Sequence, residues 1–132
     1  MPVPHHLPHP WRYLGEHWPE VVVAHDLTRP WPRAITDWSA PVPRIRMYRG
    51  MEQVERRCAA THERFHLELG PAVRGHSGWV ERRVVDLTAR WLLPDLDVMR
   101  RTLAGGGLHS AADELWVTFT VLVDRLNGPQ RS

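Results

Sequence analysis

Two histidines and a glutamate stand close together near the middle of the chain, in the segment Thr61-His62-Glu63-Arg64-Phe65-His66. The four-residue spacing between His62 and His66 places both imidazoles on one face of a helix, where they can bind a single metal ion. Imidazole nitrogens at this spacing are typical ligands of zinc. The segment therefore predicts a zinc site.

Glu63 follows the first histidine directly and is expected to point beside the metal rather than at it. There it can take a proton from a water held by zinc, whose pKa the metal lowers to about 7, and deliver that proton to a leaving amine. The alternative is a pair of core histidines hydrogen-bonded to protein groups, because buried polar atoms need partners. The intervening glutamate and an available third ligand favour the metal site.

A catalytic zinc ion usually takes three protein ligands, and Glu81 is the best candidate for the third. At about 100° per residue, Glu81 lies at the edge of its helix's apolar stripe, so its carboxylate should face the interior. Asp86 lies on the opposite side of that helix, where a solvated residue is expected. Asp86 and His76 stay open as alternatives for this ligand.

The candidate residues lie on two predicted helices. Apolar residues at helical spacing predict the first over Met51–Leu69, which Gly70 ends. A second stripe predicts a helix over about Trp79–Leu93, which stops before Pro94.

Shorter helices are expected after them. Asp95 or Asp97 could start one that the glycines at 105–107 end. The sequence Ser110-Ala111-Ala112-Asp113 resembles a capping box that opens the last helical segment. Crowded β-branched residues predict a break in that segment near Trp116–Thr120.

The first third of the chain reads differently. Residues 1–10 hold four prolines and are predicted to be a flexible arm. A short helix over Trp11–His17 and three strands are expected next, and turns that contain proline separate the strands. We expect a small antiparallel sheet, whose strands are Glu20–His25, Ala34–Trp38 and Arg44–Tyr48.

Length and composition limit the class of protein. The 132 residues suit one domain, expected over residues 11–132, and the hydrophobic fraction of 42 % can form a core. The 17 basic residues are all arginine and the net charge is +2. Arginines alternate with carboxylates along most of the chain, which predicts a solvated surface. Because Ser110–Leu126 holds only one arginine against three acids, direct nucleic-acid binding is not expected.

The sequence also suggests a compartment. No apolar run approaches the roughly 18 residues of a membrane span, so no membrane association is expected. The first residues lack the basic and apolar regions of a secretory signal, and the lone Cys58 cannot form an internal disulfide. We therefore expect a cytoplasmic protein. Cys58 is also a weaker candidate ligand, since a buried apolar role is usual for such a cysteine.

The order of these features resembles the ImmA/IrrE family of zinc metallopeptidases, in the short form common in actinobacteria and their phages and mobile elements. The resemblance runs from about Trp11 to Leu126. Its most specific stretches are residues 53–63, which lead into the zinc motif, and Ala89-Arg90-Trp91-Leu92-Leu93-Pro94. Residues 112–117 resemble the start of the paired short helices that usually follow.

The resemblance implies an α+β, zincin-like small domain with a short antiparallel sheet packed on helices and the H-E-x-x-H helix at its centre. It implies His62, His66 and Glu81 as zinc ligands and Glu63 as the catalytic residue. The expected function is a zinc-dependent endopeptidase that cleaves a partner protein such as a phage or mobile-element repressor. The alternative is a non-proteolytic binding protein, an anti-repressor, that retains the fold.

Overall fold

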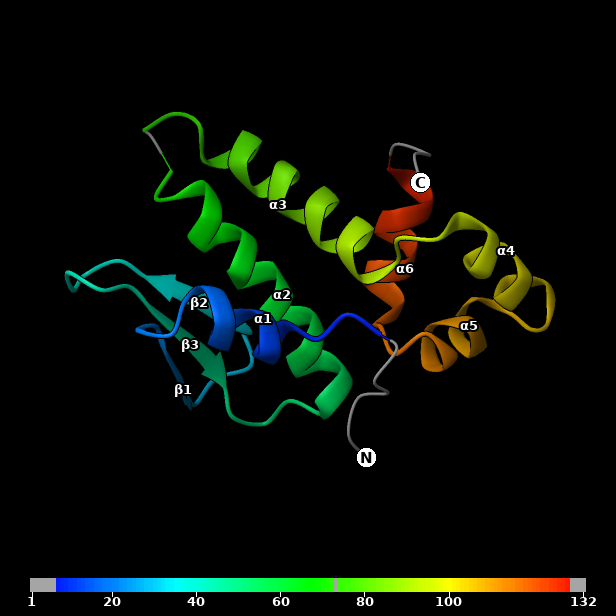
Figure 1. Cartoon of the computed structure of the whole chain (residues 1–132), viewed down its shortest axis with the longest axis horizontal. Coiled ribbons are helices and arrows are strands. Elements are labelled where there is room, and N and C mark those ends of the chain that lie inside the picture. Colours follow the sequence, from blue (N-terminus) through cyan, green and yellow to red (C-terminus); the bar gives the residue numbers. More distant parts are fainter. Residues whose placement is uncertain (1–6, 73, 129–132) are drawn as a thin grey trace.

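The computed structural model describes residues 7–72 and 74–128, and this part of the chain has an α+β fold with six helices and one three-stranded sheet (Figure 1). The elements in chain order are α1 (Pro10–His17), β1 (Val22–Leu27), β2 (Ala34–Asp37), β3 (Arg44–Tyr48), α2 (Gln53–Leu69), α3 (Ser77–Leu92), α4 (Leu96–Ala104), α5 (Leu108–Glu114) and α6 (Phe119–Asn127). None of the helices in the described ranges combines the length and the hydropathy that a membrane span requires.

The described end of the predicted N-terminal arm makes defined contacts. Residues 1–6 of that arm lie outside the described residues. Pro10 opens α1, and the Nδ1 atom of His9 accepts a hydrogen bond from the backbone N–H of Arg12 at 3.2 Å. Pro8 gives its carbonyl to the guanidinium of Arg57. Residues 8–10 are therefore tied to the rest of the fold.

The sheet is mixed, with the strand order β1-β3-β2. β2 pairs antiparallel with β3, whereas β1 pairs parallel with β3. The prediction of an antiparallel sheet is therefore wrong for β1. Residues 28–33 carry the chain from the end of β1 past β3 to the start of β2, so the first two strands are not neighbours. Alternation of side chains locates strands but does not say which of them pair.

One face of the sheet packs on helices. In β3 the side chains of Ile45 and Met47 are 0 % exposed, while those of Arg44 and Arg46 are half-buried on the other face. The buried pair forms a cluster with Leu14 of α1 and with apolar residues of α2. Helix α2 contacts this sheet as well as α1 and α3, so it joins the sheet to the other helices (Figure 1).

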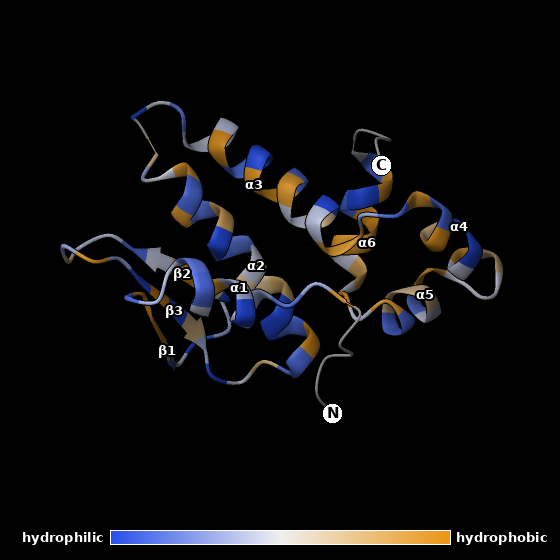
Figure 2. Ribbon diagram, viewed as in Figure 1, coloured by the Kyte–Doolittle hydropathy of each residue, from blue (hydrophilic) through white to orange (hydrophobic). Residues whose placement is uncertain are grey.

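The C-terminal core is a second apolar cluster, which fills the space between α3 and the three last helices. Figure 2 shows apolar segments along both α3 and α6, the helices that contact each other there. Its buried members are Cys58, Ala89, Leu92, Leu93, Leu96, Met99, Ala111, Ala112, Val117, Val121 and Leu122.

The starts of the short helices confirm one prediction and correct another. Asp95 caps α4 by accepting the backbone N–H groups of Asp97 and Val98. The predicted capping box at Ser110 is wrong, because α5 already begins at Leu108 and Ser110 lies inside its first turn. The glycines at 105–107 end α4 at Ala104, so α5 can begin at Leu108, before the predicted start. The predicted break is present, since the chain leaves the helix after α5 and Thr118 caps α6.

Three arginines depart from the predicted solvated surface. Arg57, Arg64 and Arg125 are all buried. Arg57 donates hydrogen bonds to the backbone carbonyls of Pro8, Leu115 and Trp116. Arg64 pairs with Glu68 at 3.2 Å and also packs its guanidinium over aromatic rings of Tyr13, Phe65 and Trp91. The guanidinium group has several donors in one plane, so a buried arginine can bind backbone carbonyls. Its flat cation can also stack on aromatic rings.

Candidate metal centre

Helix α2 has nearly the predicted bounds, and it carries His62, Glu63 and His66 in its C-terminal half. The two histidines lie one turn apart, with 5.0 Å between their ring centroids. One ligand atom from each of the three side chains lies within 4.8 Å of the other two. We call these three residues the metal group, because they could hold a metal ion.

Glu81 extends from α3 and bridges the two histidines. Its Oε1 atom lies 2.7 Å from Nε2 of His62, and its Oε2 atom lies 2.9 Å from Nε2 of His66. The carboxylate does not face the interior as expected, since the side chain is 52 % exposed. Two imidazole nitrogens and a carboxylate nevertheless meet at one place. This is a set of donors that suits a divalent transition metal.

Glu63 lies beside the two histidines and also reaches toward β2. Its side chain is only 4 % exposed, and its Oε1 atom accepts a hydrogen bond from the hydroxyl of Thr36 at 3.0 Å. Burial raises the pKa of Glu63 to about 7, while Thr36 opposes that rise by favouring the charged form. The group is therefore poised to gain or lose a proton near neutral pH.

His62 is set up to stay neutral. Burial lowers the pKa of His62, the carboxylate of Glu81 opposes that shift, and the nearby imidazole of His66 adds to it. A neutral imidazole has a free lone pair for a metal ion, whereas a protonated one has none. The electrostatics of the site therefore favour the form of His62 that can act as a ligand.

The other candidate ligands lie elsewhere. Asp86 forms ion pairs with Arg83 and Arg90 of its own helix, at 3.6 and 3.7 Å, and is half-buried rather than fully solvated. His76 is exposed at the residue before α3. Cys58 is buried in the C-terminal core, where its sulfur accepts the backbone N–H of Thr118 at 3.5 Å. The structure thus brings Glu81, and not these three residues, to the histidines.

Thr36 is the residue at this site that sequence reasoning missed. No motif marks it, and it lies in a strand of four residues. The alternation of side chains along β2 could have placed it on the same face as Ala34, toward the helices. It could not have shown that α2 presents Glu63 to that face.

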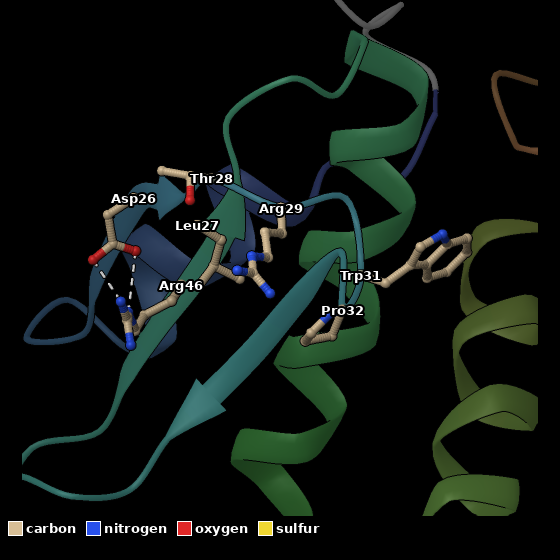
Figure 3. Close-up of a pocket in the computed structure, with 7 residues that line it drawn as sticks. All are labelled: Asp26, Leu27, Thr28, Arg29, Trp31, Pro32 and Arg46. Atoms are coloured by element: carbon tan, nitrogen blue, oxygen red, sulfur yellow. Dashed lines mark hydrogen bonds and ion pairs between the residues drawn. The ribbon is translucent and has the colours of Figure 1, made fainter.

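The hollow in Figure 3 is separate from the metal group. It has a volume of about 290 Å³ and is lined by Asp26, Leu27, Thr28, Arg29, Trp31, Pro32 and Arg46. Asp26 neutralises Arg46 through both carboxylate oxygens, each 3.1 Å from Nε. The Trp31 ring points away from the other lining side chains, toward α3 in this view (Figure 3). None of the lining residues belongs to the metal group, so the hollow adds no ligand to that site.

No protein-family model, curated protein or solved structure matches the chain. The function of the site is therefore inferred from its geometry.

Proposed function

We propose that the chain is a zinc-dependent endopeptidase with a zincin-like fold. The observation that carries this proposal is the meeting of Glu81 from α3 with both histidines of α2, beside the buried Glu63. Zinc prefers histidine nitrogen and carboxylate oxygen, and a catalytic site keeps one position open beyond three protein ligands. His62, His66 and Glu81 are the proposed ligands.

Glu63 is the proposed proton carrier. When bound, zinc lowers the pKa of water to about 7 and polarises a scissile carbonyl. Glu63 takes a proton from the attacking water as the water oxygen bonds to the carbonyl carbon. It then gives that proton to the amide nitrogen as the carbon–nitrogen bond breaks, and is again a carboxylate. Its hydrogen bond to Thr36 of β2 suits this role better than that of a ligand.

The edge of the sheet is the proposed substrate site. β2 pairs with β3 along one edge, and no other described strand pairs with its second edge. An extended peptide can add there by main-chain hydrogen bonds. Thr36 of the same strand contacts Glu63, so a peptide on this edge passes close to the proton carrier.

The proposed substrate is a transcriptional repressor. The support for this proposal is the resemblance of the sequence to ImmA/IrrE metallopeptidases. Because a repressor of a phage or mobile element acts in the cytoplasm, we propose that compartment for the protein. Direct contact with nucleic acid is not part of this proposal.

Metal analysis tests the ligands. The wild type should hold one zinc ion per chain, and His62→Ala, His66→Ala and Glu81→Ala should each lose most of it. Asp86→Ala is the matched control, because it removes a carboxylate from the same helix that pairs with arginines instead. In a zinc-loaded crystal a Glu81 oxygen should lie about 2.0 to 2.2 Å from the metal. Unchanged zinc content in both histidine variants would refute the metal site.

Glu63→Gln tests hydrolysis apart from metal binding. The amide keeps the size of the side chain but cannot take up the proton, so zinc content should be retained and cleavage reduced to a small residual rate. Co-expression of the wild type with a repressor encoded beside it should yield repressor fragments. The variant should leave that repressor intact.

One observation favours a second candidate, a non-proteolytic binding protein. Glu81 already gives the Nε2 atom of each histidine a partner within the chain, so neither Nε2 atom needs a metal ion. An anti-repressor of this kind would inactivate its partner by contact. In that case Glu63→Gln would inactivate the repressor as well as the wild type does, and neither protein would produce fragments.

A further inference from the structure

Thr36 links the edge strand of the sheet to the helix that carries the metal group. It stands opposite Ile45 in the antiparallel pair of β2 with β3. Because Ile45 is buried against the helices, Thr36 lies on that same face of the sheet. Its hydroxyl donates to Oε1 of Glu63, 27 positions further along the chain.

The setting makes this contact matter more than a surface hydrogen bond. Glu63 is almost fully buried, so little water can replace a lost partner. A hydroxyl bound to an ionised oxygen is among the stronger hydrogen bonds in proteins. It also fixes the direction of the carboxylate, since the donor belongs to a paired strand rather than to a mobile loop.

We propose that Thr36 is a positioning residue for Glu63: it holds Oε1 and leaves Oε2 as the oxygen that takes the proton from the attacking water. This inference rests on the proposed endopeptidase function. It adds that one strand has two tasks, because β2 both receives the substrate at its edge and orients the proton carrier through Thr36. A substrate seated on β2 is thereby brought into register with Glu63.

The test compares two substitutions of nearly the same size. Thr36→Val keeps the shape and removes the hydroxyl, whereas Thr36→Ser keeps the hydroxyl and removes the methyl group. The probe is a library of quenched fluorogenic peptides, from which one peptide that the zinc-loaded wild type cleaves is chosen for kinetics. Thr36→Val should lower kcat by about 10- to 100-fold with little change in KM and zinc content, as expected for a hydrogen bond to a charged group. Thr36→Ser should restore kcat to within a few-fold of the wild type.

A double variant separates positioning from general damage. If Thr36 acts through Glu63, Thr36→Val combined with Glu63→Gln should be no slower than Glu63→Gln alone. A Thr36→Val enzyme at the wild-type rate, a Thr36→Ser enzyme as slow as Thr36→Val, or additive losses in the double variant would each overturn the proposal.

Metal-free protein gives a readout that does not depend on activity. Thr36→Val should lower the melting temperature of the metal-free protein more than Thr36→Ser does, because it leaves the buried Glu63 oxygen without its donor. Equal melting temperatures for the two variants would overturn the contact itself. If the wild type cleaves none of the peptides and no repressor, the proposed function fails, while this measurement still decides whether Thr36 holds Glu63.

Discussion

The metal group with Glu81 and the C-terminal core both lie where helices α2 and α3 meet, but different side chains join the helices at the two places. Near Glu81 the two helices meet through two imidazoles and one carboxylate that are partly exposed, beside a small buried cluster of Phe65, Val80 and Val84. Further along, Cys58 of α2 and Leu92 of α3 lie in a cluster of buried apolar side chains. The same pair of helices is therefore joined near one end by polar contacts beside a small apolar cluster, and toward the other end by the larger apolar core alone.

The difference separates stability from chemistry. Burial of apolar area stabilises the fold whatever the pH or metal content of the solution. A buried carboxylate such as Glu63 is unfavourable when charged, and histidines change partners when they bind a metal. We therefore expect solution conditions to act mainly on the end of the helix pair that carries the metal group.

The largest expected effect concerns the C-terminal core. Leu122 is 0 % exposed, so Leu122→Ala should lower the free energy of unfolding by about 2 to 5 kcal/mol. Urea unfolding should give the same loss with and without zinc. Val98→Ala is the control, because this residue is exposed on α4 and its change should stay within about 0.5 kcal/mol. A loss for Leu122→Ala that depended on zinc would contradict the division between the two ends.

The next effect concerns Glu63 in metal-free protein. Its pKa is raised in the folded state from 4.5 to about 7, so the fold loses stability as the pH rises through that range. Glu63→Gln removes this loss and should be more stable than the wild type at pH 8, by on the order of 3 kcal/mol, and show no such gain at pH 4. Urea unfolding of chelator-treated proteins measures the difference. Both proteins keep His62, so the contribution of its titration cancels in the comparison. Equal stability of the two proteins at both pH values would contradict the prediction.

Zinc itself should stabilise the polar end to a similar or smaller degree. At a free zinc concentration 100 times the Kd, the free energy of unfolding should rise by about 2.7 kcal/mol. The rise should vanish in His66→Ala and persist in His109→Ala, because His109 stacks on Phe119 far along the chain from the metal group. Thermal unfolding with and without a chelator measures both. An equal rise in the two variants would place the zinc elsewhere.

The smallest expected effect concerns Cys58 at the apolar end. Burial raises the pKa of the Cys58 thiol, so few native molecules carry the reactive thiolate. Iodoacetamide should modify this cysteine slowly in the native protein and quickly in urea, as mass spectrometry can follow. Cys58→Ala should lower the free energy of unfolding by about 1 kcal/mol and leave zinc content unchanged. Rapid native alkylation that zinc suppresses would instead make Cys58 part of the metal site.

Local pattern was enough to find most elements and the candidate ligands. The strand Arg44–Tyr48 has the predicted bounds, and α2 and α3 begin within two residues of prediction. The helical repeat alone brings His62 and His66 to one face, because it is set by the backbone and not by the rest of the fold. The same repeat was less reliable for Glu81, whose carboxylate reaches the histidines from an exposed rim.

Contacts between distant segments were decided only by the tertiary structure. Sequence alternation could not reveal that β1 pairs parallel with β3, or that the guanidinium of Arg57 would be buried on the carbonyls of Pro8 and Trp116. It could not join Thr36 to Glu63. Periodicity records which face of an element is apolar, since that depends on neighbours a few residues away. Which polar groups meet across two elements depends on how the whole chain packs, and in this protein that packing brings a threonine of the edge strand to the glutamate of the H-E-x-x-H helix.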